Sequence, residues 1–120
     1  MSVFDINPVP KPRQTRADKW KKRPSVLRYR AYADEVRLKV KNMELNHAVI
    51  TFFIQMPASW SEKKKQKMAR MPHQQKPDID NLAKALFDAL YADDSHIHEV
   101  NLRKRWDYKD SISIEFDQGE

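Results

Sequence analysis

The second half of the chain contains four aspartates and a lysine whose types and spacing suit chemistry on a phosphate ester. Asp78 and Asp80 are separated by one residue, Lys84 follows one helical turn later, and Asp93-Asp94 form a second acidic pair. A phosphodiester is anionic, so carboxylates repel it unless a cation lies between them. Carboxylate oxygens without a thiolate favour hard cations such as Mg²⁺ or Mn²⁺. The set therefore suits metal-assisted hydrolysis of a phosphodiester.

A single helix is expected to position these side chains within the segment 76–98, KPDIDNLAKALFDALYADDSHIH. Pro77 suits the approach to a helix but not its interior, and Asp78 or Asp80 can serve as the N-cap. The two acidic pairs are then one helix length apart, and they converge only if the following strand runs back alongside the helix. The helix should end near Tyr91, because apolar residues recur at helical spacing at Leu82, Ala83, Leu86, Ala89 and Leu90.

Each of these features also has a purely structural interpretation. An Asp-x-Asp at a helix start commonly caps the helix and interacts favourably with its dipole, and Asp-Asp after a helix commonly forms a turn. Asp80 and Lys84 can form a surface ion pair. His96 and His98 share a face of a predicted strand, where they either bind a metal or hydrogen-bond to the loop. A functional site is favoured because all the acidic and basic features occur in one short segment.

Composition restricts the class of protein. The chain has 120 residues, no cysteine and a formal net charge of +6. We expect one domain spanning residues 1–120, with a modest core that dimerisation would enlarge. The absence of cysteine excludes disulfides and thiolate zinc sites and fits a reducing cytosol. No apolar run approaches transmembrane length, so we expect no membrane partner. We also expect no small-molecule cofactor. The basic charge predicts a polyanionic partner such as nucleic acid.

A basic, proline-containing segment at residues 7–23 precedes the first long helix. Its prolines favour an extended or looped backbone. Basic residues around Trp20 suit phosphate contacts and stacking on an exposed base, although a solvated loop with Trp20 in the core is the alternative. We expect nucleic-acid contacts from Arg13, Arg16, Lys19, Lys21, Lys22, Arg23 and Lys76.

The remaining segments predict an α+β fold, a mixed β-sheet with helices packed on it. The apolar, β-branched segment 48–56 should be a central strand, and Ser59-x-x-Glu62 resembles a capping box that starts a short basic helix. The last two strands are expected to form a hairpin. The predicted order is strand 3–6, helix 24–41, strand 48–56, helix 59–70, helix 78–91, strand 97–107 and strand 111–116.

The acidic segment resembles the core of the RusA family of Holliday-junction resolvases. The family pattern is D-x-D-N-L-x-K-x-x-x-D-x-L, followed by D-D and an aliphatic residue. Here the sequence reads PDIDNLAKALFDAL from Pro77 to Leu90 and then has Asp93-Asp94 followed by Ile97. The close match covers about a fifth of the chain, and the remainder is similar to the family in length and element order.

The resemblance implies roles for individual residues. Asp78, Asp80 and Asp94 would be catalytic and would hold one or two Mg²⁺ ions, for which Mn²⁺ can substitute, with Asp93 as a possible further ligand. The ions would generate the nucleophile and stabilise the leaving 3′-oxygen. Lys84 would be catalytic, lying near Asp80 and stabilising charge on the phosphate.

The resemblance also implies a substrate and an assembly. The protein would be a homodimer that cuts four-way junction DNA by paired symmetric nicks during recombination and repair, in the cytoplasm of a bacterium or phage-infected cell. Two other classes stay open. One is a non-catalytic basic nucleic-acid-binding protein. The other is a metal-dependent phosphohydrolase of nucleotides, although a chain with one glycine has no glycine-rich phosphate loop.

Overall fold

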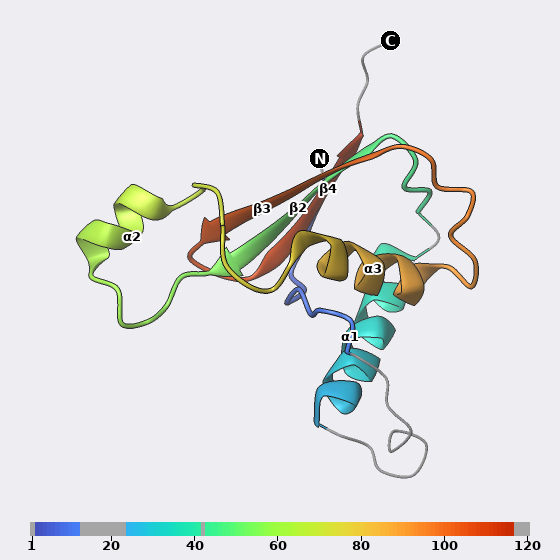
Figure 1. Cartoon of the computed structure of the whole chain (residues 1–120), viewed down its shortest axis with the longest axis horizontal. Helices are drawn as coiled ribbons and strands as arrows, with labels where there is room; N and C mark the ends of the chain where they lie inside the picture. The colour runs from blue at the N-terminus through green and yellow to red at the C-terminus, as the bar shows by residue number, and fades with distance from the viewer. Residues whose placement is uncertain (1, 13–23, 42, 117–120) are drawn as a thin grey trace.

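The computed structural model describes residues 2–12, 24–41 and 43–116, which form a mixed four-stranded sheet and three helices. Two helices lie against one face of the sheet and the third projects beyond it (Figure 1). The expected α+β class and mixed sheet are confirmed. In chain order the elements are β1 (Ser2–Phe4), α1 (Pro24–Val40), β2 (Ala48–Gln55), α2 (Glu62–Met68), α3 (Ile79–Leu90), β3 (Val100–Asp107) and β4 (Ser111–Phe116).

The sheet has the strand order β1-β4-β2-β3, which confirms the interior position of β2. The predicted hairpin of the last two strands is wrong, because β2 lies between them, parallel to β3 and antiparallel to β4. A strand as buried as β2 needs hydrogen-bond partners along both edges. The turn from β3 to β4 instead passes the end of β2, where Gln55 N donates to Asp110 Oδ1 at 2.7 Å and Met56 N donates to Asp107 O at 2.9 Å.

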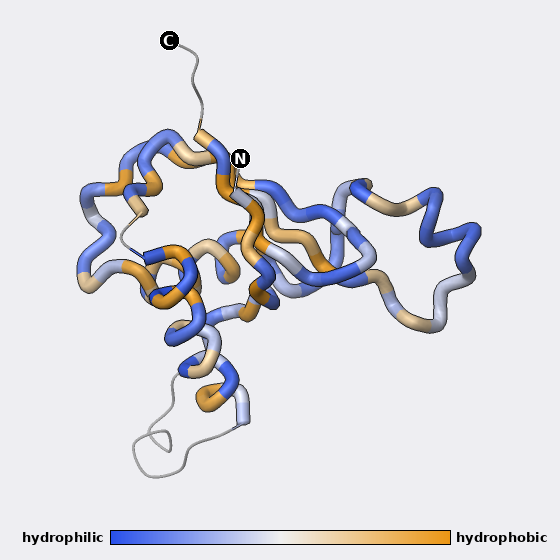
Figure 2. The backbone as a smooth tube through the Cα atoms, turned by 180° about the vertical axis from the view of Figure 1, so that it is seen from behind, coloured by the Kyte–Doolittle hydropathy of each residue, from blue (hydrophilic) through white to orange (hydrophobic). Residues whose placement is uncertain are grey.

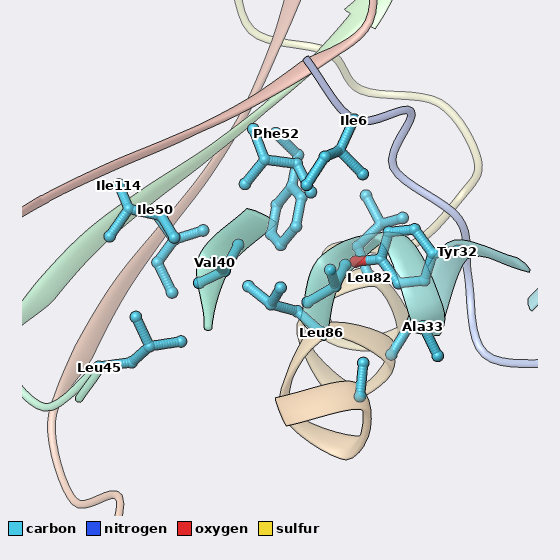
Figure 3. Close-up of a cluster of buried hydrophobic side chains, with 14 of the residues drawn as sticks. Ile6, Tyr32, Ala33, Val40, Leu45, Ile50, Phe52, Leu82, Leu86 and Ile114 are labelled. Atoms are coloured by element: carbon cyan, nitrogen blue, oxygen red, sulfur yellow. The ribbon is translucent and has the colours of Figure 1, made fainter. Parts of the chain in front are cut away.

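The hydrophobic core lies between the helix-covered face of the sheet and the helices α1 and α3 (Figure 3). Side chains two apart on a strand share a face, so Ile50 and Phe52 point into this core together. Residues three or four apart share a helix face, which gives α1 and α3 one buried stripe each. The stripes are Tyr32, Ala33, Val36 and Val40 in α1, and Leu82, Ala85, Leu86 and Ala89 in α3.

Polar contacts also fix α3 in place. Tyr29 of α1 donates its hydroxyl hydrogen bond to Ala85 O at 3.3 Å, and Arg37 Nε donates to Ala89 O at 2.9 Å. A guanidinium on one of the last carbonyls of a helix satisfies an acceptor that has no partner within the helix. The helix that carries the acidic segment is therefore held along its length by α1.

Candidate active site

Asp78 and Asp80 lie at the N-terminal end of α3, as predicted. Asp78 occupies the N-cap position, but its side chain makes no capping hydrogen bond. Both residues are exposed, and Asp78 lines a surface hollow together with Pro10, Lys76, Pro77 and Asn81. The positive end of the helix dipole favours negative charge here. The Asp78 carboxylate is thus positioned by the helix while its oxygens stay available to a ligand.

Lys104 of β3 meets the same end of α3, and the sequence analysis did not single it out. Its ammonium donates hydrogen bonds to the carbonyls of Gln75 and Pro77, the latter at 2.7 Å. Burial lowers the pKa of Lys104, and the nearby charge of Asp78 opposes that shift. The signal in the sequence was its spacing. Lys104 is two residues from both Leu102 and Trp106, so it shares the inward-facing side of the strand with these apolar residues.

Lys84 is exposed on α3 and turns toward the C-terminal half of the helix. Its Nζ lies 3.9 Å from Asp88 Oδ2, and Lys11 Nζ contacts the same oxygen at 3.1 Å. The ion pair of Lys84 among the described residues is thus with Asp88, and not with Asp80 as the sequence analysis considered. A four-carbon stem on an exposed helix face leaves the Lys84 ammonium free to reorient toward an anion.

The second acidic pair follows the other end of α3, and its two members differ. Asp93 Oδ1 accepts a hydrogen bond from Ser95 N at 2.9 Å, and hydrogen bonds from the Ser95 backbone and side chain lower the pKa of Asp93. Asp93 therefore closes a turn. Asp94 is exposed and lines a second hollow with Phe87 and Ile97, and its carboxylate has no hydrogen-bond partner within the described parts of the chain.

The histidines beside this pair contact the loop. His96 Nε2 lies 3.4 Å from Glu44 Oε2, and its ring packs edge-on against Tyr91. The backbone N–H of His98 donates to Asn46 Oδ1 at 2.8 Å. The contact with Glu44 supports the hydrogen-bonding interpretation for His96, whereas the hydrogen bond of His98 comes from its backbone and leaves the role of its side chain a prediction.

The two acidic pairs do not meet within one chain. The 12 residues of α3 separate them, and a helix of that length is about 18 Å long, whereas Mg²⁺–oxygen bonds are about 2.1 Å. Accordingly, no group of three or more acidic or histidine side chains that could hold a metal ion occurs within residues 2–12, 24–41 and 43–116. The following strand does run back toward the start of α3, but it brings Lys104 there.

The predicted nucleic-acid contacts are described only in part. Lys76 is exposed and lines the hollow with Asp78. The described start of the basic segment reaches this region, because Pro10 lines the same hollow and Lys11 contacts α3. The other six predicted contacts lie outside the described residues: Arg13, Arg16, Lys19, Lys21, Lys22 and Arg23.

The α+β scaffold presents carboxylates that are not engaged in capping hydrogen bonds, together with basic residues, at one end of a helix. This arrangement fits the class of metal-dependent nucleases. The chain belongs to the endodeoxyribonuclease RusA family, whose family model matches residues 5–116. The family consists of metal-dependent endodeoxyribonucleases that resolve Holliday junctions. No curated protein and no solved structure matches the chain. Within the described residues, no helix has the length and apolar character needed to cross a membrane.

Proposed function

We propose that this protein is a Mg²⁺-dependent endonuclease that works as a homodimer, each chain a single domain over residues 1–120, and resolves four-way junction DNA by paired symmetric nicks. The observation that carries the proposal is the Asp78 carboxylate, which stands at the N-terminus of α3 without a capping hydrogen bond. Capping was the structural alternative for this residue, and the absence of the capping bond argues against it. The family membership supplies the reaction class.

Asp78 and Asp80 are the proposed metal-binding carboxylates of each chain. Their oxygens suit a hard divalent cation, and Mg²⁺ commonly uses only one or two carboxylates together with water and substrate phosphate. The bound ion would supply Lewis-acid activation of the scissile phosphate. The chain's own part is to hold the carboxylates at a fixed helix end. Lys84 is exposed one turn along α3 and paired with Asp88, and it would neutralise charge on a phosphate bound there by reorienting its ammonium.

We further propose that Asp94 joins this site from a second copy of the chain. Asp94 follows the C-terminal end of α3, and within one chain the length of the helix keeps it from Asp78. A two-fold axis across α3 would set two copies of the helix antiparallel, with Asp94 of each copy beside Asp78 of the other. Asp93, whose carboxylate closes a turn, is a weaker candidate ligand.

A complementation experiment separates a shared site from a site within one chain. Asp78→Asn and Asp94→Asn are each expected to abolish cleavage. If the site is shared, a mixed dimer of the two variants retains one intact site and makes single nicks without full resolution. If each chain supplied its whole site, the mixture would stay inactive, and the proposed sharing would be wrong.

The proposed activity itself is tested on a synthetic mobile four-way junction, with Mg²⁺ or EDTA, using the parent chain beside Asp80→Asn. We expect paired nicks at symmetric positions that disappear with EDTA and in the variant. Junction binding in EDTA should persist in the variant, because the substitution removes a negative charge near phosphate. Cleavage by Asp80→Asn at the parental rate would refute the assigned role.

The basic segment and Lys76 are the proposed DNA contacts next to this site. Their support is the position of the described flank, where Pro10 and Lys76 line the hollow that contains Asp78. Lysine and arginine side chains neutralise phosphates without reading sequence, so they suit a substrate recognised by its shape.

A further inference from the structure

Residues 57–72, which we call the basic arm, lie between β2 and α3 in the sequence and extend beyond the sheet. Figure 1 shows α2 projecting away from the sheet, and Figure 2 shows that this projection is largely hydrophilic. None of the residues of α2 is buried. The helix therefore does not contribute to the hydrophobic core, and its exposed surface needs another explanation.

The base of the arm, in contrast, is firmly attached to β3. The ring of Trp60 lies 4.8 Å from that of Trp106, with His73 on Trp106 at 4.2 Å. The returning chain pairs with β3, because Arg70 N donates to Trp106 O at 2.7 Å and Trp106 N donates to Met71 O at 3.0 Å. The arm is therefore an ordered projection with a fixed base.

The helix of the arm concentrates positive charge. Its seven residues, EKKKQKM, include four lysines, and the Ser61 hydroxyl caps it by accepting a hydrogen bond from Lys64 N at 3.2 Å. Lys63 and Lys67 are one turn apart, where like charges repel. Among the described residues, no carboxylate forms an ion pair with the exposed Lys63, Lys64 or Lys67. An anionic partner would relieve this repulsion.

We propose that the basic arm binds the phosphate backbone of a duplex arm of the substrate junction, independently of base sequence. This inference rests on the proposed function for the nature of the DNA. Lysines are flexible point charges that suit phosphates better than base edges. One helical turn is about 5.4 Å, while each DNA strand has one phosphate charge per about 3.4 Å of axis, so lysines one turn apart can contact nearby phosphates.

The connection between the arm and the acidic site supports the same partner. The chain leaves the arm through His73, whose N–H donates to Lys104 O at 3.1 Å, and Lys104 in turn holds the carbonyls of Gln75 and Pro77 just before Asp78. DNA held by the arm would therefore be held by an element directly braced against the end of α3 that bears the candidate site.

The test is the salt dependence of junction binding by a variant with Lys63→Gln, Lys64→Gln and Lys67→Gln. Glutamine retains helix propensity similar to lysine. Affinities for the junction are measured in EDTA across a salt series. The slope of log affinity against log salt should become shallower by up to about 2.7, so the affinity advantage of the parent over the variant should shrink up to about forty-fold between about 50 and 200 mM salt.

A matched control removes the same charge elsewhere, with Arg28→Gln, Arg30→Gln and Lys41→Gln, all exposed on or next to α1. The arm proposal expects a larger slope change for the arm variant than for this control. Equal changes would show that only overall charge matters, and an unchanged slope in the arm variant would also overturn the proposal. Cleavage under saturating enzyme should stay at the parental rate, because these lysines do not belong to the proposed site.

The outcomes separate this inference from the proposed function. If the parent chain neither binds nor cuts the junction, the proposed function fails. If the parent cuts the junction while the arm variant binds with the parental slope, only the arm proposal fails. Thermal unfolding checks that the variant is folded, and the single substitution Lys63→Gln, with an expected slope change of about 1, gives an independent measurement.

Discussion

Replacement of Lys104 by methionine tests how the acidic end of α3 is held. Methionine preserves an unbranched apolar stem within β3 but removes the ammonium. The loop before α3 then loses two hydrogen bonds, to the carbonyls of Gln75 and Pro77, and Asp78 loses a nearby positive charge. We expect a less stable protein whose Asp78 carboxylate is less well positioned.

The magnitude follows from the surroundings of each bond. A hydrogen bond from a charged donor contributes about 1.5–3 kcal/mol. Water can replace the ammonium at the exposed Gln75 carbonyl, so most of the loss comes from the partly buried bond to Pro77. The free energy of unfolding should therefore fall by about 1.5–3 kcal/mol. Poorer positioning of the Asp78 carboxylate weakens metal binding. Loss of the positive charge of Lys104 beside the exposed Asp78 strengthens metal binding, but by less than about 1 kcal/mol. The Mg²⁺ concentration for half-maximal cleavage should therefore rise.

Urea unfolding followed by circular dichroism measures the first effect, and a Mg²⁺ titration of junction cleavage measures the second. Arg103→Met is the control, because it removes a charge from the neighbouring, exposed position of β3. If Lys104→Met and Arg103→Met had the same unfolding midpoint, the anchoring role of Lys104 would be refuted.

Two further predictions concern one buried and one partly buried polar side chain. The His73 side chain is buried, and its Nδ1 has no hydrogen-bond partner among the described residues. Burial, and to a smaller extent the charge of Lys104, lowers the pKa of His73 below 6.5. The unfolded chain then binds more protons, so stability should be lost as pH falls through about 6.5, and His73→Gln should flatten that dependence in urea titrations at several pH values. Tyr91 donates to Met43 O at 2.7 Å and accepts from Leu45 N at 3.1 Å. Tyr91→Phe should cost about 1–3 kcal/mol of unfolding free energy, because it leaves these backbone groups unpaired, and an unchanged denaturation curve would contradict this.

How well the sequence predicted each element depends on how far apart in the sequence the interacting residues are. The helix that became α3 was predictable because the spacing of Leu82, Leu86 and Ala89 is a local property. The pairing of the last two strands was mispredicted because β2 inserts between them, and which strands become neighbours depends on burial across the whole sheet. Sequence proximity favoured a hairpin that the packing of β2 excludes.

The candidate site shows the same division. The positions of Asp78 and Asp80 at a helix start followed from Pro77 and the apolar spacing. The approach of Lys104 did not, because it depends on the parallel register of β3 against β2. The two-residue spacing of Lys104 from Leu102 and Trp106 indicated an inward-facing side chain, but it did not indicate which groups this side chain would contact.

The parallel pairing of β2 and β3 has a consequence for how proteins built on this plan can diversify. Parallel neighbours require a connection that returns from the end of one strand to the start of the next. Here that connection contains the basic arm and α3, while its ends are fixed by the pairing of Ala48 with Val100 and of Gln55 with Asp107. Residues can be inserted into or deleted from α2, which has no buried residue, without shifting this register or opening the core. The number of residues in the arm can thus set how far the protein extends along a nucleic acid, independently of the geometry of its acidic residues.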